Sequence, residues 1–250
     1  MEEYNASTYG ERIAHAYDER FTERLDSAGT VEAIANLATA SGATKVLELA
    51  IGTGRIALPL KERGFDVHGV DISDAMVAKL RGKPGGADIP VTMGNFAEVP
   101  VEGTFKLIYL VFNTFFALLT QSEQIECMEN VAAHLEPSGI FVIECFVPDL
   151  ARYQRGQSVS AAEVGVDAVE LDVSRHTATE QRIDASHVVL RDGDVRVYPV
   201  RLRYAWPSEL DLMARIAGLK LRERWGGWER EPFTDDSGSH VSIYERAWES

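Results

Sequence analysis

The sequence predicts an α/β fold built on a doubly wound, mostly parallel sheet. Apolar strand-like runs alternate with amphipathic helical segments between residues 45 and 147, which is the order typical of such sheets. The runs are nearly continuous in apolar residues, as expected of parallel strands that helices cover on both faces. A third observation is the tight turn Gly52-Thr53-Gly54, which lies between the first run and the helical pattern behind it.

The first forty residues predict two helices. Ser7 can cap the first helix and Thr30 the second, which Gly42 ends. The first helix carries aromatic and apolar residues on one face at four-residue spacing, namely Tyr9, Ile13, Tyr17 and Phe21.

Five strands are expected in the parallel part of the sheet. Their ranges are Lys45–Ile51, Phe65–Val70, Pro90–Gly94, Lys106–Phe112 and Ile140–Val147. One helix follows the glycine turn and runs through Leu60, and Ser73 caps the next. The sequence Thr120-Gln121-Ser122-Glu123 has the form of a capping box and predicts a third helix.

From about residue 164 the pattern changes to antiparallel strands. The expected strands are Val166–Arg175, Ile183–Arg191 and Val195–Ala205, and Asp192-Gly193-Asp194 marks a hairpin turn. We expect residues 164–205 to form an inserted layer on the sheet, with a solvated, acid-rich outer face, and not a separate domain. A helix from Pro207 and two strands, Leu219–Trp225 and His240–Trp248, complete the chain.

Charge and composition exclude several partners. The 39 acidic and 25 basic residues give a net charge of −14, which disfavours a surface that collects nucleic-acid phosphates. No apolar run reaches the ~20 residues of a membrane span, and the amino terminus lacks a signal-peptide pattern. The two cysteines, Cys127 and Cys145, form no metal-binding or disulfide pattern. We therefore expect a cytoplasmic protein without a metal, membrane or nucleic-acid partner.

The glycine turn and the acid after the second strand carry the main functional signal. Glycines allow close approach of the backbone to a ligand, and an acid in the position of Asp71 can accept hydrogen bonds from ribose hydroxyls. An adenosine-containing cofactor is the leading interpretation, and a plain turn with a helix-capping Asp71 is the simpler one. Gly52-x-Gly54-x-x-Ala57 also fits the dinucleotide fingerprint. However, Glu48 would repel a pyrophosphate, and no tyrosine is followed by lysine four residues later.

Four segments of the sequence resemble the class I S-adenosylmethionine-dependent methyltransferases. They are VLELAIGTGRIALPL, HGVDIS, MGNFAEVP and FKLIYLVFNTFFALLT, and the resemblance covers about residues 9–148. It implies S-adenosyl-L-methionine as the cofactor and a Rossmann-like, seven-stranded sheet that ends in an antiparallel hairpin. It also implies that residues 1–42 form an N-terminal helical lid, and that residues 43–250 form the methyltransferase domain with its inserted β layer.

The same resemblance implies a set of cofactor contacts. Glu48 would orient the loop or the methionine amine, Asp71 would bind the ribose hydroxyls, and Ile72 would flank the adenine. The other implied contacts are the loop residues Ala50, Gly52 and Gly54, the adenine-edge residues Asn95 and Phe96, and Leu110, Val111, Tyr17 and Arg55 near the methionine part. The sequence departs from the family at Ala50, where glycine is common, and at Asn95, where aspartate is common.

The acceptor is expected to be a small molecule, methylated on an oxygen or nitrogen atom. In-line displacement at the methyl group relies mainly on proximity and orientation, so no catalytic dyad is required. The candidate acceptor contacts are Tyr9, Phe112, Asn113, Phe116, His176, Tyr204 and Trp228, and each of them could instead be a plain core residue. His176 and Tyr204 are the candidates for a catalytic role.

Two alternative functions and three arrangements of the inserted strands stay open at this stage. A nicotinamide-dependent oxidoreductase could use a similar sheet, and a cofactor-binding module without catalysis could use the same loop. The inserted strands could roof the acceptor, pack on the sheet, or form the contact of a homodimer.

Overall fold

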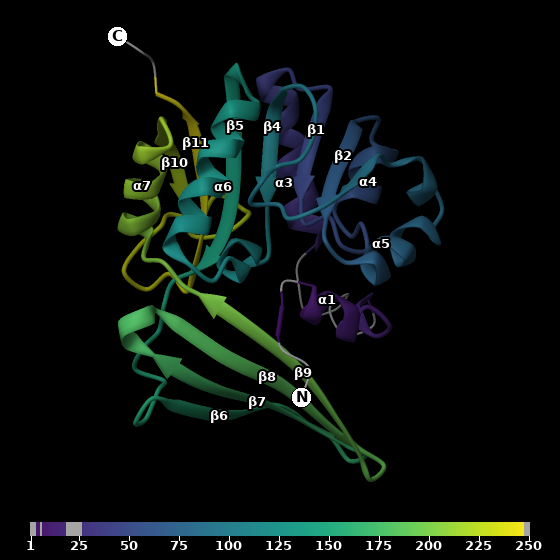
Figure 1. Cartoon of the computed structure of the whole chain (residues 1–250), viewed down its shortest axis with the longest axis vertical. Coiled ribbons are helices and arrows are strands. Elements are labelled where there is room, and N and C mark those ends of the chain that lie inside the picture. The colour runs from purple at the N-terminus through teal and green to yellow at the C-terminus, as the bar shows by residue number, and fades with distance from the viewer. Residues whose placement is uncertain (1–3, 6, 19–26, 248–250) are drawn as a thin grey trace.

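The computed structural model describes residues 4–5, 7–18 and 27–247 and contains two sheets, one above the other in Figure 1. The large sheet has the strand order β10-β11-β5-β4-β1-β2-β3, and the small sheet has the order β6-β7-β8-β9. The large sheet consists of β1 (Lys45–Leu49), β2 (Asp66–Asp71), β3 (Val91–Met93), β4 (Phe105–Leu110), β5 (Leu135–Phe146), β10 (Leu219–Trp225) and β11 (Ser239–Arg246).

Helices cover both faces of the large sheet, which explains its continuously apolar strands. On one side lie α3 (Ser27–Ser41), α4 (Ala57–Glu62) and α5 (Asp74–Arg81), and on the other lie α6 (Gln121–His134) and α7 (Pro207–Ile216). In β4, Leu107 and Tyr109 face the first side while Ile108 and Leu110 face the second. The predicted doubly wound sheet is confirmed, and it ends in the antiparallel β10–β11 pair.

The small sheet consists of β6 (Gln157–Val164), β7 (Ala168–Thr177), β8 (Arg182–Arg191) and β9 (Asp194–Arg203), all antiparallel. Its inner face packs against the core of the large layer through Ile183, Ala185 and Leu202. Alternate residues along each strand point to the opposite, outer face. The small sheet lies across one edge of the large layer (Figure 1), and the large layer covers only its inner face.

The first strand of the small sheet was not predicted. β6 reads QSVSAAEV and is almost entirely exposed, so it lacks the alternation of apolar and polar residues that marks a half-buried strand. The insertion therefore begins at residue 157 and not at 164.

The two predicted amino-terminal caps are also different in the structure. Thr30 lies within α3 and is buried, so it does not cap that helix. Ser7 stands at the cap position of α1 (Thr8–Ile13) with a helical backbone and without a side-chain capping bond, and its hydroxyl donates to Asn5 Oδ1. Phe21, expected on the apolar face of the first helix, lies outside the described residues.

Helix α1 lies between the two layers, next to α5 and β9 (Figure 1). A Cβ on Gly10 would lie 2.7 Å from Ser73 Cβ, so glycine is what allows α1 to approach the start of α5 this closely. Ile13 and Tyr9 pack beside Tyr198 of β9 and Met76 of α5. Within the described part of the chain, no helix is long and apolar enough to cross a membrane.

Candidate active site

The loop after β1 turns sharply at the carboxyl edge of the large sheet. Ala50, Gly52 and Gly54 have left-handed backbones, with φ of 54°, 56° and 77°, a conformation that costs least for glycine. A Cβ on Gly52 would have one neighbour within 4 Å, the Ala50 carbonyl oxygen at 3.9 Å. A Cβ on Gly54 would lie 2.3 Å from Leu80 Cδ1. Gly52 therefore faces open space that a ligand can fill, whereas Gly54 allows the loop to pack on α5.

Asp71 ends β2 and directs its carboxylate toward this loop. Its Oδ2 accepts a hydrogen bond from the Gly52 amide at 2.7 Å, and its Oδ1 accepts one from the Ser73 amide at 2.8 Å. Burial raises the pKa of this carboxyl group, and the two amides act in the opposite direction. Each oxygen keeps a further lone pair, so Asp71 can still accept a pair of hydroxyl groups. The neighbouring Ile72 side chain is exposed and flanks the same opening.

Glu48 is a buried carboxyl group near the carboxyl end of β1. Its Oε2 accepts a hydrogen bond from the Tyr109 hydroxyl at 3.0 Å. Burial raises the pKa of Glu48 to about 8, although Tyr109 and Arg55 partly counteract burial. Glu48 is thus mostly protonated at neutral pH, and a cationic group arriving beside it would favour its ionised form.

Arg55 connects three segments of the chain around the mouth of the loop. Its guanidinium carbon lies 3.9 Å from the centre of the Phe112 ring and 5.5 Å from the centre of the Tyr17 ring. Its Nη2 also lies 3.4 Å from the Tyr17 hydroxyl. The helix start after the glycine loop, the end of β4 and the amino-terminal segment therefore meet at this arginine.

A partly buried carboxylate, Glu144 of β5, organises the neighbouring strand ends and was not predicted as a site residue. Its Oε2 accepts a bond from the Phe112 amide at 2.7 Å, and its Oε1 accepts one from Trp228 Nε1 at 3.0 Å. Burial raises the pKa of Glu144. Asn113 Oδ1 accepts a bond from the Phe146 amide at 2.6 Å. The signal available in the sequence was an acid inside an otherwise apolar strand, as at Glu48.

The amino-terminal segment is bonded directly to the glycine loop. Asp18 Oδ1 accepts a bond from the Thr53 hydroxyl at 2.6 Å, and Asp18 Oδ2 lies 2.7 Å from Lys83 Nζ. Lys83 also donates to the Thr53 carbonyl at 2.8 Å. Within α1, Glu11 Oε1 accepts a hydrogen bond from the Ser73 hydroxyl at 2.7 Å. These contacts hold the segment over the loop, and sequence periodicity could not predict them because they join residues 35 to 65 positions apart.

Other predicted cofactor contacts lie around the same opening but have fewer side-chain groups available to a ligand. Asn95 Oδ1 is already used by the Ala97 amide at 3.0 Å, and Phe96 is buried. Leu110 and Val111 are buried with side chains in the two separate cores, so mainly their backbone is available.

The predicted acceptor residues of the inserted strands come together on the inner face of the small sheet. His176 Nε2 and the Tyr204 hydroxyl lie 2.9 Å apart, and the His176 ring stacks on Tyr153 with ring centres 4.9 Å apart. Burial raises the pKa of Tyr204. Phe116, in contrast, is fully buried against Phe146. Tyr153 was missed because it precedes the expected insertion.

Comparison with known proteins identifies the family. The model of the methyltransferase domain family matches residues 46–139. The chain is 30% identical to the cypemycin N-terminal methyltransferase of a Streptomyces species, over 96% of this chain and 98% of that protein. It is 41% identical to the CcbJ methyltransferase of Streptomyces caelestis, whose structure superposes with a TM-score of 0.88 over 98% of this chain and 100% of that one.

The chain belongs to the S-adenosylmethionine-dependent methyltransferases. Its fold also matches CalS10, a SAM-bound amino pentose methyltransferase of Micromonospora echinaspora, with a TM-score of 0.68 at 21% identity over 97% of this chain and 98% of that one. The cofactor of this methyltransferase is therefore S-adenosyl-L-methionine, and the oxidoreductase alternative is set aside.

The residues at the carboxyl edge of the large sheet fit this cofactor. The space over Gly52 is open, Asp71 retains acceptor sites for two ribose hydroxyls, and the buried Glu48 can pair with an ammonium group. A nucleoside with a cationic amino-acid part can use all three features.

Proposed function

We propose that this methyltransferase transfers the methyl group to a nitrogen atom of a small molecule. The acceptor would lie between the carboxyl edge of the large sheet and the inner face of the small sheet. The observation that carries this proposal is the aromatic and imidazole cluster of Tyr153, His176 and Tyr204, which is built on the one covered face of the small sheet. The net charge of −14 favours a small acceptor over nucleic acid.

The proposed division of labour assigns the cofactor to the large sheet. Asp71 would hold the ribose, Glu48 the amino group of the methionine part, and Gly52 the backbone contact. Residues 1–42 would act as a lid, because Asp18 and Tyr17 bond to groups on the glycine loop and its helix. The remaining contacts implied by the family resemblance would complete the cofactor site. They are Ala50, Gly54, Arg55, Ile72, Asn95, Phe96, Leu110 and Val111.

When bound, the cofactor supplies a methyl group on a sulfonium, whose leaving group is already cationic and needs no protonation. The protein's own contribution is then positioning, which can supply ~7–11 kcal/mol of effective molarity. His176 is the group on the inner face suited to receive a proton from the acceptor, with the Tyr204 hydroxyl 2.9 Å away holding its ring. A nitrogen acceptor requires less of such a base than an alcohol does.

Two observations support nitrogen over oxygen. The relative that matches 96% of this chain is, by its name, an N-terminal methyltransferase. The partly buried carboxylate of Glu144, together with the acidic net charge, favours a cationic or amine-bearing acceptor over an anionic one. The two buried, free cysteines are in keeping with a cytoplasmic enzyme.

The test is transfer of labelled methyl groups to matched acceptor pairs that differ only in an amino or hydroxyl group, such as an amino sugar and its hydroxy analogue. We expect label on the amine and little on the alcohol. Exclusive labelling of the alcohols would overturn the choice of nitrogen. Labelling of nucleic acid or folded protein alone would overturn the small-molecule assignment.

A further inference from the structure

The outer face of the small sheet is apolar and uncovered. The large exposed aliphatic side chains of its strands all lie on this face, as the strand register requires. They are Val159, Val164, Val173, Leu190, Val195 and Val197, with exposed fractions between 37% and 74%. The sequence had predicted a solvated, acid-rich outer face; the face is exposed, but its middle is apolar and not acid-rich. Contiguous apolar patches of this kind mark interaction surfaces.

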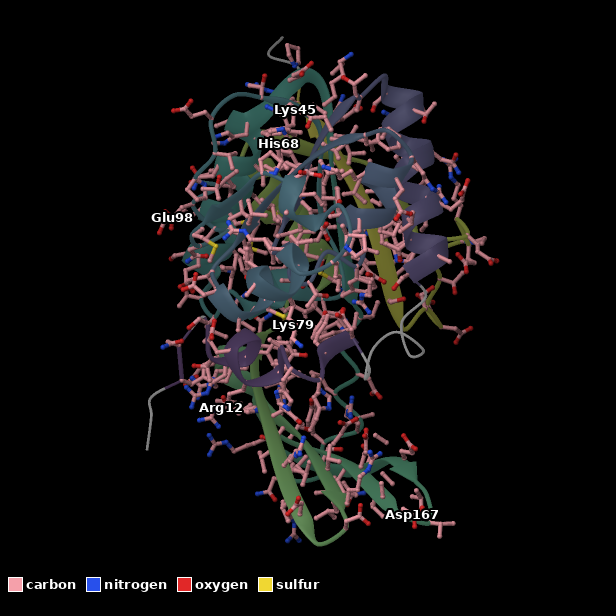
Figure 2. The ribbon with its side chains drawn as sticks, turned by 90° about the vertical axis from the view of Figure 1, so that its right-hand side faces the viewer. Arg12, Lys45, His68, Lys79, Glu98 and Asp167 are labelled. Carbon is pink, nitrogen blue, oxygen red and sulfur yellow. The ribbon has the colours of Figure 1, made fainter. Side chains whose placement is uncertain are left out.

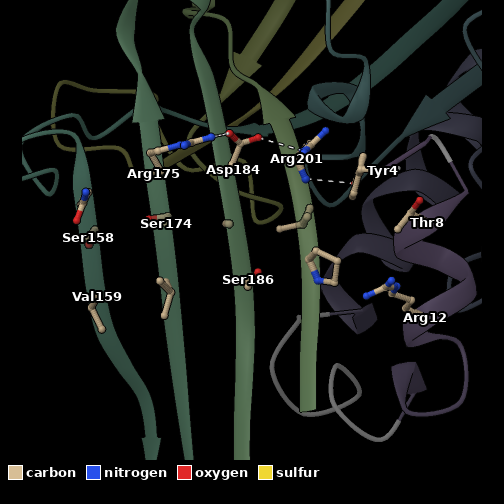
Figure 3. A pocket seen from close by; sticks show the side chains of 15 residues that line it. Tyr4, Thr8, Arg12, Ser158, Val159, Ser174, Arg175, Asp184, Ser186 and Arg201 are labelled. Carbon is tan, nitrogen blue, oxygen red and sulfur yellow. Dashed lines mark hydrogen bonds and ion pairs between the residues drawn. The ribbon is translucent and has the colours of Figure 1, made fainter. Parts of the chain in front are cut away.

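The end of this face next to α1 is hollowed and basic. The hollow has a volume of about 530 Å³ and is lined by the four strands and by the amino-terminal segment (Figure 3). Arg12, Arg175 and Arg201 line it together with one carboxylate, Asp184. Asp184 Oδ2 lies 2.9 Å from Arg175 Nη2, and its Oδ1 lies 3.2 Å from Arg201 Nε. One carboxylate thus stands among three guanidinium groups in an otherwise acidic protein.

The opposite end of the small sheet is acidic. Asp192 lies in the β8–β9 hairpin turn and Asp167 in the neighbouring β6–β7 turn, whereas the register places Asp194, Arg191 and Arg196 on the inner face. Figure 2 shows Asp167 at the free tip and Arg12 close to the large layer. Along its length, the outer face therefore runs from a basic hollow through an apolar middle to a tip whose turns carry Asp167 and Asp192.

We propose that this outer face binds the same face of a second copy of the chain. In the pairing that the charges favour, the two-fold axis runs between the sheets and perpendicular to the strands. That axis reverses the strand direction, so the acidic tip of one subunit lies over the basic hollow of the other. An axis parallel to the strands would instead put the arginines of both subunits against each other, which costs free energy. The contact is isologous, as two-fold interfaces require.

The size of the face suits a stable dimer. Strands of ten residues span about 34 Å, and four of them at about 4.8 Å cover roughly 19 Å, which gives an area of about 650 Å² before side-chain relief is counted. A standard interface buries about 800 Å² on each partner. The residues of the hollow that come from the amino-terminal segment, Tyr4, Thr8 and Arg12, extend the contact toward that value. They also belong to the segment that covers the glycine loop.

The decisive measurement is sedimentation of the full-length chain between about 0.1 and 100 µM. We expect a dimer, and Val197→Glu should raise its dissociation constant at least about a hundredfold, because the interface would have to bury an unpaired charge. Ile216→Glu is the matched control, since Ile216 is 62% exposed on α7, away from this face. The control should leave the dissociation constant unchanged within about threefold. Binding of S-adenosylhomocysteine and the thermal unfolding of each variant at low concentration report that the subunit itself is intact.

A second variant tests the pairing. The double substitution Asp167→Lys and Asp192→Lys should weaken the dimer at least about tenfold at low salt, and the loss should shrink as salt rises. Glu62→Lys with Asp66→Lys, which changes the same charge elsewhere on the surface, should have no such effect. A wild-type chain that is monomeric throughout the concentration range would overturn the proposal. This holds even if the apolar face were found to bind phospholipid vesicles instead. A dimer that is insensitive to both Val197→Glu and the tip substitutions would also overturn it.

Discussion

Replacing Asp71 by asparagine tests the proposed ribose contact with the least change of shape. In the structure the two carboxylate oxygens each accept one backbone amide, from Gly52 at 2.7 Å and from Ser73 at 2.8 Å. Their remaining lone pairs are the sites proposed for the two ribose hydroxyls. A hydrogen bond to a charged group contributes roughly 1.5–3 kcal/mol and a neutral one roughly 0.5–1.5. Losing the charge should thus cost about 1 kcal/mol for each hydroxyl.

The new amide group adds to this cost. One of the two former oxygen positions becomes an NH₂, which cannot accept from a backbone amide or from a hydroxyl. We therefore expect a total loss of about 2–3 kcal/mol, which corresponds to a dissociation constant roughly thirty- to a hundred-and-fiftyfold weaker.

Calorimetric titration of S-adenosylhomocysteine measures this loss directly. Asp74→Asn is the matched control, because Asp74 is exposed in the first turn of α5, three residues along the chain, and it should change the dissociation constant by less than about threefold. Wild-type affinity in a folded Asp71→Asn variant would refute the reasoning. Thermal unfolding of both variants separates lost binding from lost structure.

Three further predictions concern the loop, the buried acid and the acceptor side. Gly52→Val should abolish S-adenosylhomocysteine binding in calorimetry while circular dichroism stays native-like, because the side chain fills the open space and resists the φ of 56°; normal binding would mean that the loop does not approach the ligand. Burial raises the pKa of Glu48 from 4.5 to about 8, so the free energy of unfolding should fall as pH rises through that window, by up to about 5 kcal/mol. Glu48→Gln should make this fall smaller in denaturant titrations at several pH values, because only the contributions of other buried acids such as Asp71 and Glu144 remain; an unchanged pH dependence would contradict the assignment. His176→Ala and Tyr204→Phe should alter the acceptor Michaelis constant or turnover and leave S-adenosylhomocysteine affinity within about threefold; the reverse pattern would exchange the roles of the two sheets.

The large sheet could be predicted because its signals are local. Strands β1 and β4 are mostly apolar runs, and the Thr120–Glu123 capping box forms as its sequence indicates. The glycine loop and Asp71 were likewise recognisable, since their spacing along the chain fixes their geometry. The family resemblance then supplied the cofactor.

What could not be predicted depends on contacts between distant residues or on exposed strands. The bond between Asp18 and Thr53 and the role of Glu144 arise only when the chain is folded. β6 has no apolar alternation because it is an edge strand with exposed faces. The apolar outer face of the small sheet was hidden because its valines are distributed over four strands, so it emerges only once the strand register is known.

The measurement that tests the division of labour most directly is a crystal structure with S-adenosylhomocysteine bound. We predict that both ribose hydroxyls contact the Asp71 carboxylate, that the amino group lies beside Glu48, and that the sulfur faces the inner side of the small sheet near His176 and Tyr204. A nucleoside bound away from Asp71, or a sulfur atom that faces away from the small sheet, would contradict it.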